Sequence, residues 1–382
     1  MGRYEVTMRA RIRKFIVVGC LAIGVSALSL AAAQSSASAP TKDPRSALTP
    51  VLNKVKGLKP AARERRLYQL ARAEGTLEWY TSMSAPISEP VEKAFEAKYP
   101  GVQVNRYRAS SESVTQRITQ EARAGTAGAD VVETNGTEML QYQNAGNILI
   151  PYTTSPYRKT IPKFGRFNGF TADRIEHFIV AWNTNLVSSG DRPKSYEDLA
   201  NDKWKGKIAM EPSDVDWWYG VSTYLRRKSK WSQARIDRMW RGMAQNALIV
   251  PSHTTQVNLL AAGQFSVCVS CHSHSTKDLI EKGAPLAFRP LVQPVVQRPQ
   301  GVGVVQRLRH PAGALLFYDW LLTKNGGQRT MQQNHIDPAR LDMTDAAFRR
   351  AKIWNVNIRT VVSRFNTLSK DYDELMRLGK KR

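Results

Sequence analysis

The chain has 382 residues, of which 42% are apolar and 23% are charged, with 56 Lys and Arg against 32 Asp and Glu. Its 9 Trp, 13 Tyr and 11 Phe supply enough apolar surface for a folded core, which excludes a mainly disordered protein. Three Cys are too few for a disulfide framework, no internal period indicates a solenoid or propeller, and the length favours two domains.

Residues 1–33 are typical of a secretory signal peptide. A basic stretch from Arg9 to Lys14 precedes an apolar run from Phe15 to Leu30, and Ala31 to Ala33 offers a small-residue cleavage site. The apolar run is shorter than the roughly 20 residues that a membrane span needs. We therefore expect export to the periplasm and cleavage after residue 33. An uncleaved anchor and lipidation at Cys20 are the alternatives.

The remaining chain is still strongly basic. Removing residues 1–33 deletes five Lys or Arg and one Glu, which leaves a net charge of +20. Nucleic acid is not expected as a partner, because the protein is exported and its cations are spread along the sequence. An anionic membrane or envelope surface is a better match. The alternative is a basic protein whose charges are simply solvated.

Residues 34–57 are rich in Ser, Ala, Thr and Pro and are predicted to form a flexible linker. From Thr76 onward, residues typical of strands alternate with residues at helical spacing. The predicted strands are 76–83, 102–107 and 129–132, and the predicted helices contain Val91 to Tyr99, Val114 to Ala122 and Met139 to Tyr142. This alternation predicts a parallel sheet covered by helices, which binds ligands at the carboxyl ends of its strands.

Small polar loops follow these first strands and are candidates for ligand binding. Hydroxyls and free backbone N–H groups at helix N-termini can hold an anionic or polar ligand. Plain helix capping is the alternative for each loop. The candidate residues are Ser82, Met83, Ser110, Ser111, Glu133 and Thr134.

A second section with the same character follows a long apolar strand at 175–186. Its predicted strands are 208–210, 266–270 and 291–305, and its predicted helices include 214–225 and 236–243. The sequence therefore predicts one α/β unit interrupted by another.

Several segments resemble the extracellular solute-binding proteins of bacterial ABC importers. They include Gly75 to Ser82, Phe95 to Val102, Gly128 to Val132, Val180 to Val187, Ser252 to Gln256, Leu259 to Gln264, Lys282 to Pro285 and His310 to Phe317. The likeness covers about residues 58–341 and is strongest to the branch that includes ferric-iron-binding proteins. Residues beyond Asp342 match poorly.

This resemblance implies a type II periplasmic binding protein fold, with two parallel-type α/β lobes joined by hinge crossovers. The implied parts are the first section of lobe 1 at 58–178, lobe 2 at 179–300, and the return to lobe 1 with C-terminal helices at 301–382. It also implies that a ligand binds between the lobes, that the lobes close on it, and that the protein is not an enzyme. The expected partners are a small-molecule or metal-complex ligand and an ABC permease in the inner membrane. We expect a monomer with no cofactor.

In lobe 2, the helix predicted at 214–225 begins near the expected cleft. Asp214, Trp217 and Tyr219 could contact the ligand there, since aromatic faces stack on planar or cationic groups. His253 and Thr254 follow a strand and could also reach it. Packing in the core is the alternative for the tryptophan, and helix capping is the alternative for the histidine.

The segment from Cys268 to His274 carries two Cys and two His. The spacing Cys-x-x-Cys-His matches a haem attachment site, but it lies in a predicted strand, which makes haem or a thioredoxin-like site a poor match. Cys268, Cys271, His272 and His274 could instead bind zinc or copper. The same residues are also compatible with a local disulfide, or with buried thiols beside a cleft-facing His272.

Two functions therefore remain. The first is a component of an ABC importer that captures an anion, a small organic solute or a metal complex. The second is an exported metal-binding or redox protein that uses the Cys and His cluster. The resemblance does not extend to ferric-iron ligation, because the ferric branch has adjacent tyrosines at this place and no Tyr lies between Gln264 and Gly283.

Overall fold

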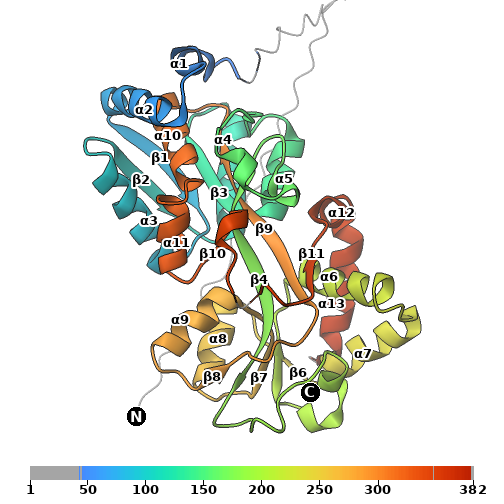
Figure 1. Cartoon of the computed structure of the whole chain (residues 1–382). Coiled ribbons are helices and arrows are strands. Elements are labelled where there is room, and N and C mark those ends of the chain that lie inside the picture. The colour runs from blue at the N-terminus through green and yellow to red at the C-terminus, as the bar shows by residue number, and fades with distance from the viewer. Residues whose placement is uncertain (1–42, 44, 347, 380–382) are drawn as a thin grey trace, which may run out of the picture. The chain divides into compact units, whose positions relative to one another are not determined.

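The structure is a computed structural model that describes residues 43, 45–346 and 348–379. The expected signal peptide and residues 34–42 of the expected linker lie outside the described residues. One sheet of eleven strands runs through the described chain, with its main path in the order β2-β1-β3-β9-β4-β7-β5-β6 (Figure 1). No helix in the described part is long and apolar enough to cross a membrane.

The first lobe is built on three parallel strands, β1 (Thr76–Thr81), β2 (Gln103–Arg108) and β3 (Val131–Asn135). Its helices are α1 (Thr49–Val55), α2 (Pro60–Glu74), α3 (Ala85–Lys98), α4 (Ser111–Ala124), α5 (Gly136–Ala145), α10 (Pro311–Leu321) and α11 (Gly327–Gln333). Short 3-10 turns lie at Arg158–Thr160, Lys163–Gly165 and Leu341–Met343. In its core, the ring of Phe317 packs against those of Trp79 and Phe95, with a centroid distance of 5.0 Å in each pair.

Two long antiparallel strands, β4 (Thr171–Asn183) and β9 (Val295–Val304), connect the first lobe to the second. β9 pairs with β3 of the first lobe, and β4 pairs with β7 (Val267–His272) of the second. Nearly every residue of both strands is buried, so both faces of this part of the sheet are covered.

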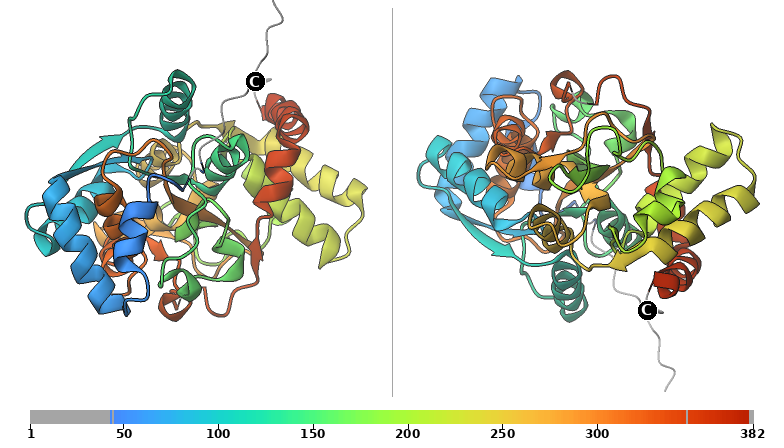
Figure 2. Two further views of the ribbon diagram at one scale, coloured as in Figure 1. Left: turned by 90° about the horizontal axis from the view of Figure 1, so that it is seen from above. Right: turned by 90° about the horizontal axis from the view of Figure 1, so that it is seen from below.

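The second lobe repeats the parallel pattern with β7, β5 (Ile208–Met210) and β6 (Ala247–Ile249). Its helices are α6 (Val215–Arg227), α7 (Gln233–Asn246), α8 (His253–Ala261), α9 (Ser273–Glu281), α12 (Ile358–Ser363) and α13 (Phe365–Gly379), with 3-10 turns at Asp198–Ala200 and Asp202–Trp204. Short strands β8 (Leu286–Ala287), β10 (Asp337–Pro338) and β11 (Ile353–Asn355) pair along β4 and β9. Helices α6 and α7 form a hairpin at the edge of this lobe (Figure 2).

The fold class expected from the sequence is confirmed, but two boundaries differ. Helix α1 occupies part of the expected linker, because Leu48, Val51 and Val55 bury their side chains in the core of the first lobe. Helix α13 does not return to lobe 1. It packs on α6 and α7 of lobe 2, since its apolar stripe of Leu368, Tyr372, Leu375 and Met376 joins the core there.

Candidate functional site

A cleft of about 640 Å³ lies between the two lobes and the crossover strands. Helices α3, α4 and α5 of the first lobe and α6, α8 and α9 of the second begin at it with their N-cap residues. Their N-cap residues Ser84, Ser110, Asn135, Asp214, Ser252 and His272 all line the cleft. Helix N-termini favour negative charge and neutral imidazole through their free N–H groups and the helix dipole. The volume is typical of a site for a small molecule.

The wall formed by the first lobe is polar and presents mostly hydroxyls. Ser82, Ser84, Ser110 and Ser111 line it at the carboxyl ends of β1 and β2. Arg108 also lines the cleft, its Nε donates to the carbonyl oxygen of Met83 at 3.2 Å, and no carboxylate of the described chain pairs with it. This wall therefore offers hydroxyls, helix N-termini and one unpaired cation to an anionic group.

The crossover strands contribute buried charges to the floor of the cleft. Arg174 on β4 lies 2.9 Å from Glu133, and Arg298 on β9 lies 2.6 Å from Asp216 on α6. Both arginines are nearly fully buried, and each is already neutralised by its partner. Glu176, also on β4, faces His272 and His274 of the second lobe.

The wall formed by the second lobe brings three histidines together. His274 Nδ1 lies 3.2 Å from Glu176 Oε1, and His272 Nδ1 lies 3.5 Å from Glu176 Oε2. The rings of His272 and His253 stack with centroids 3.6 Å apart, and His253 Nε2 lies 3.0 Å from Asp214 Oδ1. Imidazoles and carboxylates from β7, α8, α9, β4 and the start of α6 thus form one continuous cluster.

Burial and mutual charge shift the protonation of this cluster. Burial lowers the pKa of His272 well below its ordinary value, and the neighbouring His253 and His274 lower it further. Burial raises the pKa of Asp214 to about 6, although His253 opposes the rise. Burial by itself would raise the pKa of Glu176, but His274 and Arg174 outweigh it and lower that pKa. The imidazole of His272 is therefore neutral near pH 7, the form that binds metal.

Three nitrogen and oxygen atoms of the cluster are buried without a hydrogen-bond partner among the described residues. They are His272 Nε2, His253 Nδ1 and Asp214 Oδ2. An unpaired buried polar atom costs about 1–3 kcal/mol, so a ligand that pairs with these atoms gains that energy.

Among the residues that the structure describes, two sets of donors have ligand atoms within 4.8 Å of one another. The first is Glu176, His272 and His274, and the second is Glu211, Asp214 and His253. Glu211 is already committed, because its carboxylate accepts from the backbone N–H groups of Ser213 and Ser252. The first set therefore offers the better metal site, with two imidazoles and one carboxylate.

The residues expected from the sequence divide into two groups. Ser82, Met83, Ser110, Ser111, Asp214, His253, Thr254, His272 and His274 all line the cleft. Glu133, Thr134, Trp217 and Tyr219 do not. Glu133 is fully buried beside Arg174, and Thr134 donates to Ser82 Oγ at 2.9 Å. Trp217 is fully buried in the core, and Tyr219 packs partly buried against the same core.

The cysteines offer no thiolate to a metal. Cys268 and Cys271 form a disulfide, and both are fully buried on the side of β7 that packs against the core of the second lobe. Of the four candidate metal ligands in this segment, only His272 and His274 remain. The disulfide that the sequence allowed is the arrangement that the structure contains.

Sequence reasoning missed the charged residues of the crossover strands. Arg174, Glu176 and Arg298 all line the cleft, as do Val361 and Phe365 from the C-terminal helices. A signal was present in β4, because its first half carries four charged or titratable residues, Asp173, Arg174, Glu176 and His177, in a strand that is wholly buried. Charges in a buried strand need partners, and they mark a site. The C-terminal residues carry no such signal.

Known proteins resemble this chain in sequence and in structure. It is 25% identical over 249 residues to the Fe(3+)-binding periplasmic protein of Serratia marcescens, covering 62% of this chain and 71% of that one. The crystal structure of iron-bound HitA from Pseudomonas aeruginosa superposes with a TM-score of 0.64 at 19% identity, covering 78% of this chain and 99% of that one. AfuA from Actinobacillus pleuropneumoniae, with fructose-6-phosphate bound, superposes with a TM-score of 0.66 at 22% identity, covering 80% and 99%.

The family of bacterial extracellular solute-binding proteins matches residues 91–354, more than half of the chain, and the chain belongs to that family. Its fold is that of the type II periplasmic binding proteins. The chain is a solute-binding component of an ABC importer. The structural neighbours carry iron in one case and a sugar phosphate in the other, so the likeness alone does not select the ligand.

Proposed function

We propose that the cleft captures a divalent first-row transition metal ion together with a small anionic chelator. The metal is bound by Glu176, His272 and His274, and the anion is bound by the helix N-termini and Arg108 of the first lobe. The observation that carries this proposal is the set of two imidazoles and one carboxylate whose donor atoms lie within 4.8 Å.

The balance of charge in the cleft supports a ligand with a cationic centre. Three arginines line it, and two of them are already paired with buried carboxylates. The acidic residues that line it are Glu112, Glu138, Glu176, Glu211, Asp214 and Asp216. A purely anionic solute would face this excess of carboxylates, whereas a metal complex places its positive charge against them.

The size of the cleft supports a complex over a bare ion. A bare metal ion fills a small fraction of about 640 Å³, and the wall opposite the histidines consists of hydroxyls and helix N-termini that suit an oxyanion. A carboxylate or phosphate chelator bridges the two walls. Both lobes then contact the same ligand, which is the condition for closure on binding.

The donor set favours a divalent ion over ferric iron. No Tyr or Cys is among the described residues that line the cleft. Imidazole suits zinc, copper, nickel and ferrous iron. The relatives whose names mention iron therefore support a metal as the ligand, while the residues of this cleft favour a divalent ion over Fe³⁺.

The same proposal includes the cell biology expected from the sequence. The chain is exported by its N-terminal segment, works as a monomer in the periplasm, and delivers its ligand to an inner-membrane permease. The periplasmic relative and the type II fold support this part of the proposal.

Calorimetric titration of the metal-free protein tests the proposal, using Zn²⁺, Co²⁺, Ni²⁺, Cu²⁺ and Fe³⁺ with and without citrate or phosphate. We expect one divalent ion per chain, with affinity that rises when the anion is present. His272→Ala and His274→Ala each remove one ligand and should weaken binding by at least tenfold.

His335→Asn is the matched control. This histidine pairs with the exposed Glu281, does not line the cleft and has a left-handed φ of 65° that Asn tolerates. Its affinity should stay within twofold of the wild type. Equal affinity of the wild type and a His272→Ala, His274→Ala double variant would contradict the proposed metal site.

A further inference from the structure

The Cys268–Cys271 disulfide lies directly before His272 in strand β7, whose last residue lines the cleft. In a regular strand, residues three apart are separated by about 10 Å and point to opposite faces. Here the two Cα atoms are 5.6 Å apart, and both side chains lie in the same apolar cluster. Strand β7 must therefore contract between these two residues.

The pairing of β7 with β4 shows where the contraction occurs. Cys271 pairs with Ile179 and Cys268 pairs with Ala181, so two residues of β7 lie opposite Val180 alone. This is a β-bulge, with one extra residue in β7. A bulge shifts the alternation of side chains by one position for every residue that follows it.

That shift decides which way His272 points. In a regular strand, His272 would lie on the same face as Cys268, which is the core face of the second lobe. With the bulge, Cys271 takes the core face and His272 turns to the opposite face. There it meets His253 and Glu176 in the cleft.

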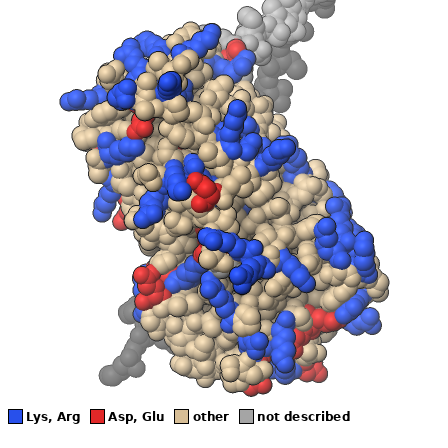
Figure 3. All heavy atoms as spheres, viewed as in Figure 1, with Lys and Arg blue, Asp and Glu red and all other residues tan. Residues whose placement is uncertain are grey.

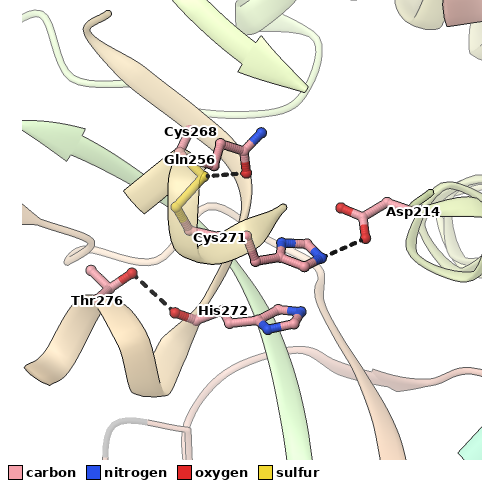
Figure 4. Close-up of a disulfide and its surroundings, with 7 residues drawn as sticks. Asp214, Gln256, Cys268, Cys271, His272 and Thr276 are labelled. Atoms are coloured by element: carbon pink, nitrogen blue, oxygen red, sulfur yellow. Dashed lines mark hydrogen bonds and ion pairs between the residues drawn. A yellow bond between two sulfur atoms is a disulfide. The ribbon is translucent and has the colours of Figure 1, made fainter. Parts of the chain in front are cut away.

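The disulfide contacts the helix that carries His253, and it lies one residue before the helix that carries His274. Cys268 Sγ lies 3.1 Å from Oε1 of Gln256, which is buried in α8 one turn after His253. At the other end, His272 is the N-cap of α9, and its carbonyl oxygen accepts a hydrogen bond from Thr276 at 3.0 Å. Figure 4 shows the disulfide next to Gln256, and His272 with Thr276 where β7 passes into α9.

We infer that the Cys268–Cys271 disulfide is a positioning device, which holds the bulge in β7 and thereby keeps His272 and His274 in the binding cleft. Two features separate this role from redox chemistry. Both cysteines are fully buried, and the bond lies on the core face of the strand, so neither sulfur can contact the ligand. The inference deepens the proposed function and depends on it for the identity of the ligand.

The test compares the oxidised protein with two forms that lack the bond. One is the Cys268→Ala, Cys271→Ala double variant. The other is the wild-type chain unfolded and refolded with a phosphine reductant and then desalted without oxygen. Two readouts are taken at one fixed pH, the ring resonances of His272 and His274 without metal, and the affinity and visible spectrum with Co²⁺ as the probe.

We expect both forms to unfold cooperatively, to show shifted ring resonances for His272 and His274, and to bind Co²⁺ at least tenfold more weakly. Reoxidation of the reduced wild-type chain should restore the resonances and the affinity. Leu286→Ala is the matched control, since it removes a buried side chain from the same cluster and lies in β8, outside the bulge. In this variant the ring resonances of His272 and His274 should not shift, and the Co²⁺ affinity should stay within twofold of that of the oxidised wild type.

Unchanged ring resonances and an affinity within twofold after reduction would overturn the inference. So would a gain in affinity with a sulfur-to-cobalt charge-transfer band, since the cysteines would then be ligands. If the double variant does not fold, the reduced wild-type chain decides the question. If the oxidised protein binds no metal at all, the proposed function fails, and the ring resonances still test the positioning role separately.

Discussion

Trp217 illustrates how a residue near a site can belong wholly to the core. Its ring is fully buried, packs edge-on against Trp240 at 5.1 Å, and its Nε1 donates to the Tyr196 hydroxyl at 3.4 Å. The sequence held the signal for this, because Trp217, Val221 and Leu225 recur every four residues and form the buried stripe of α6. The residue type allows stacking on a ligand, whereas the helical spacing favours packing in the core.

Replacing this tryptophan should therefore affect stability and leave binding intact. Trp217→Ala removes a large side chain from the core and should lower the free energy of unfolding by about 3–5 kcal/mol. Ligand affinity measured on the folded fraction should stay within twofold. Denaturant unfolding and calorimetry check the two halves of this prediction, with Trp217→Phe as the milder control. If the folded fraction of Trp217→Ala bound the ligand more than twofold more weakly, the ring would belong to the binding site.

The histidines could be predicted from the sequence, while their carboxylate partner was missed. His253 and His272 each stand where a strand or loop gives way to a helix, which is where open α/β sheets bind ligands. Glu176 stands within a strand, and only the pairing of β4 with β7 brings it to the histidines. Pairing between strands distant in sequence is a tertiary property that local patterns do not encode.

At the scale of elements, the short strand β10 fixes helix α9 in place. Asp337 accepts a hydrogen bond from Ser273 at 2.7 Å, and its carboxylate lies 2.7 Å from both His177 Nδ1 and Lys277 Nζ. Burial by itself would raise the pKa of Asp337, but the contacts with His177 and Lys277 outweigh it and hold that pKa well below its ordinary value. A residue of the returning chain thus anchors the helix that carries His274.

Asp337→Asn should destabilise the protein by about 3 kcal/mol near neutral pH, because it removes one of the carboxylates that pair with the largely buried ammonium group of Lys277. The pKa of this group is lower in the folded state than in the unfolded state. Its contribution is therefore complete above pH of about 4, the ordinary value for Asp, and is lost as the pH falls further. The difference in unfolding free energy between the wild type and the variant should shrink below that pH. Urea unfolding at a series of pH values measures it, and a constant difference down to a pH of about 2 would contradict the assignment.

The boundaries of elements were harder to predict than their order. The strands and helices of the first lobe follow clear alternation, and the structure contains them in the expected sequence. Helix α13 lies beyond the range of the family resemblance, and its apolar stripe could pack on either lobe. Tyr372 donates to the carbonyl oxygen of Glu211 at 2.8 Å, which places α13 directly behind the cleft wall of the second lobe.

For the molecule as a whole, the surface charge and the charge of the cleft differ in sign. Figure 3 shows Lys and Arg spread over both lobes on the face in view, with fewer Asp and Glu. The lining of the cleft has more carboxylates than arginines. The net charge of the chain therefore says little about the ligand. Because the cleft differs in charge from the surface, composition alone could not distinguish an anion, an organic solute and a metal complex as the ligand.

The two-lobe architecture follows from the sequence because each lobe repeats the same local alternation of strand and helix. The sequence predicts a long apolar strand at 175–186 and another strand at 291–305, and the strands found there, β4 and β9, join the lobes. The disulfide could not be singled out from the sequence, since regular alternation separates Cys268 from Cys271. Only the bulge in β7 brings them together.

Native mass spectrometry of the protein purified from the cells that produce it tests directly whether the cleft holds a metal ion together with an anion. We expect one divalent metal ion and one small anion per chain, both lost on denaturation, and a denatured mass that shows the Cys268–Cys271 disulfide intact. A ligand that is purely organic and free of metal, retained at full occupancy, would rule out the metal site at Glu176, His272 and His274.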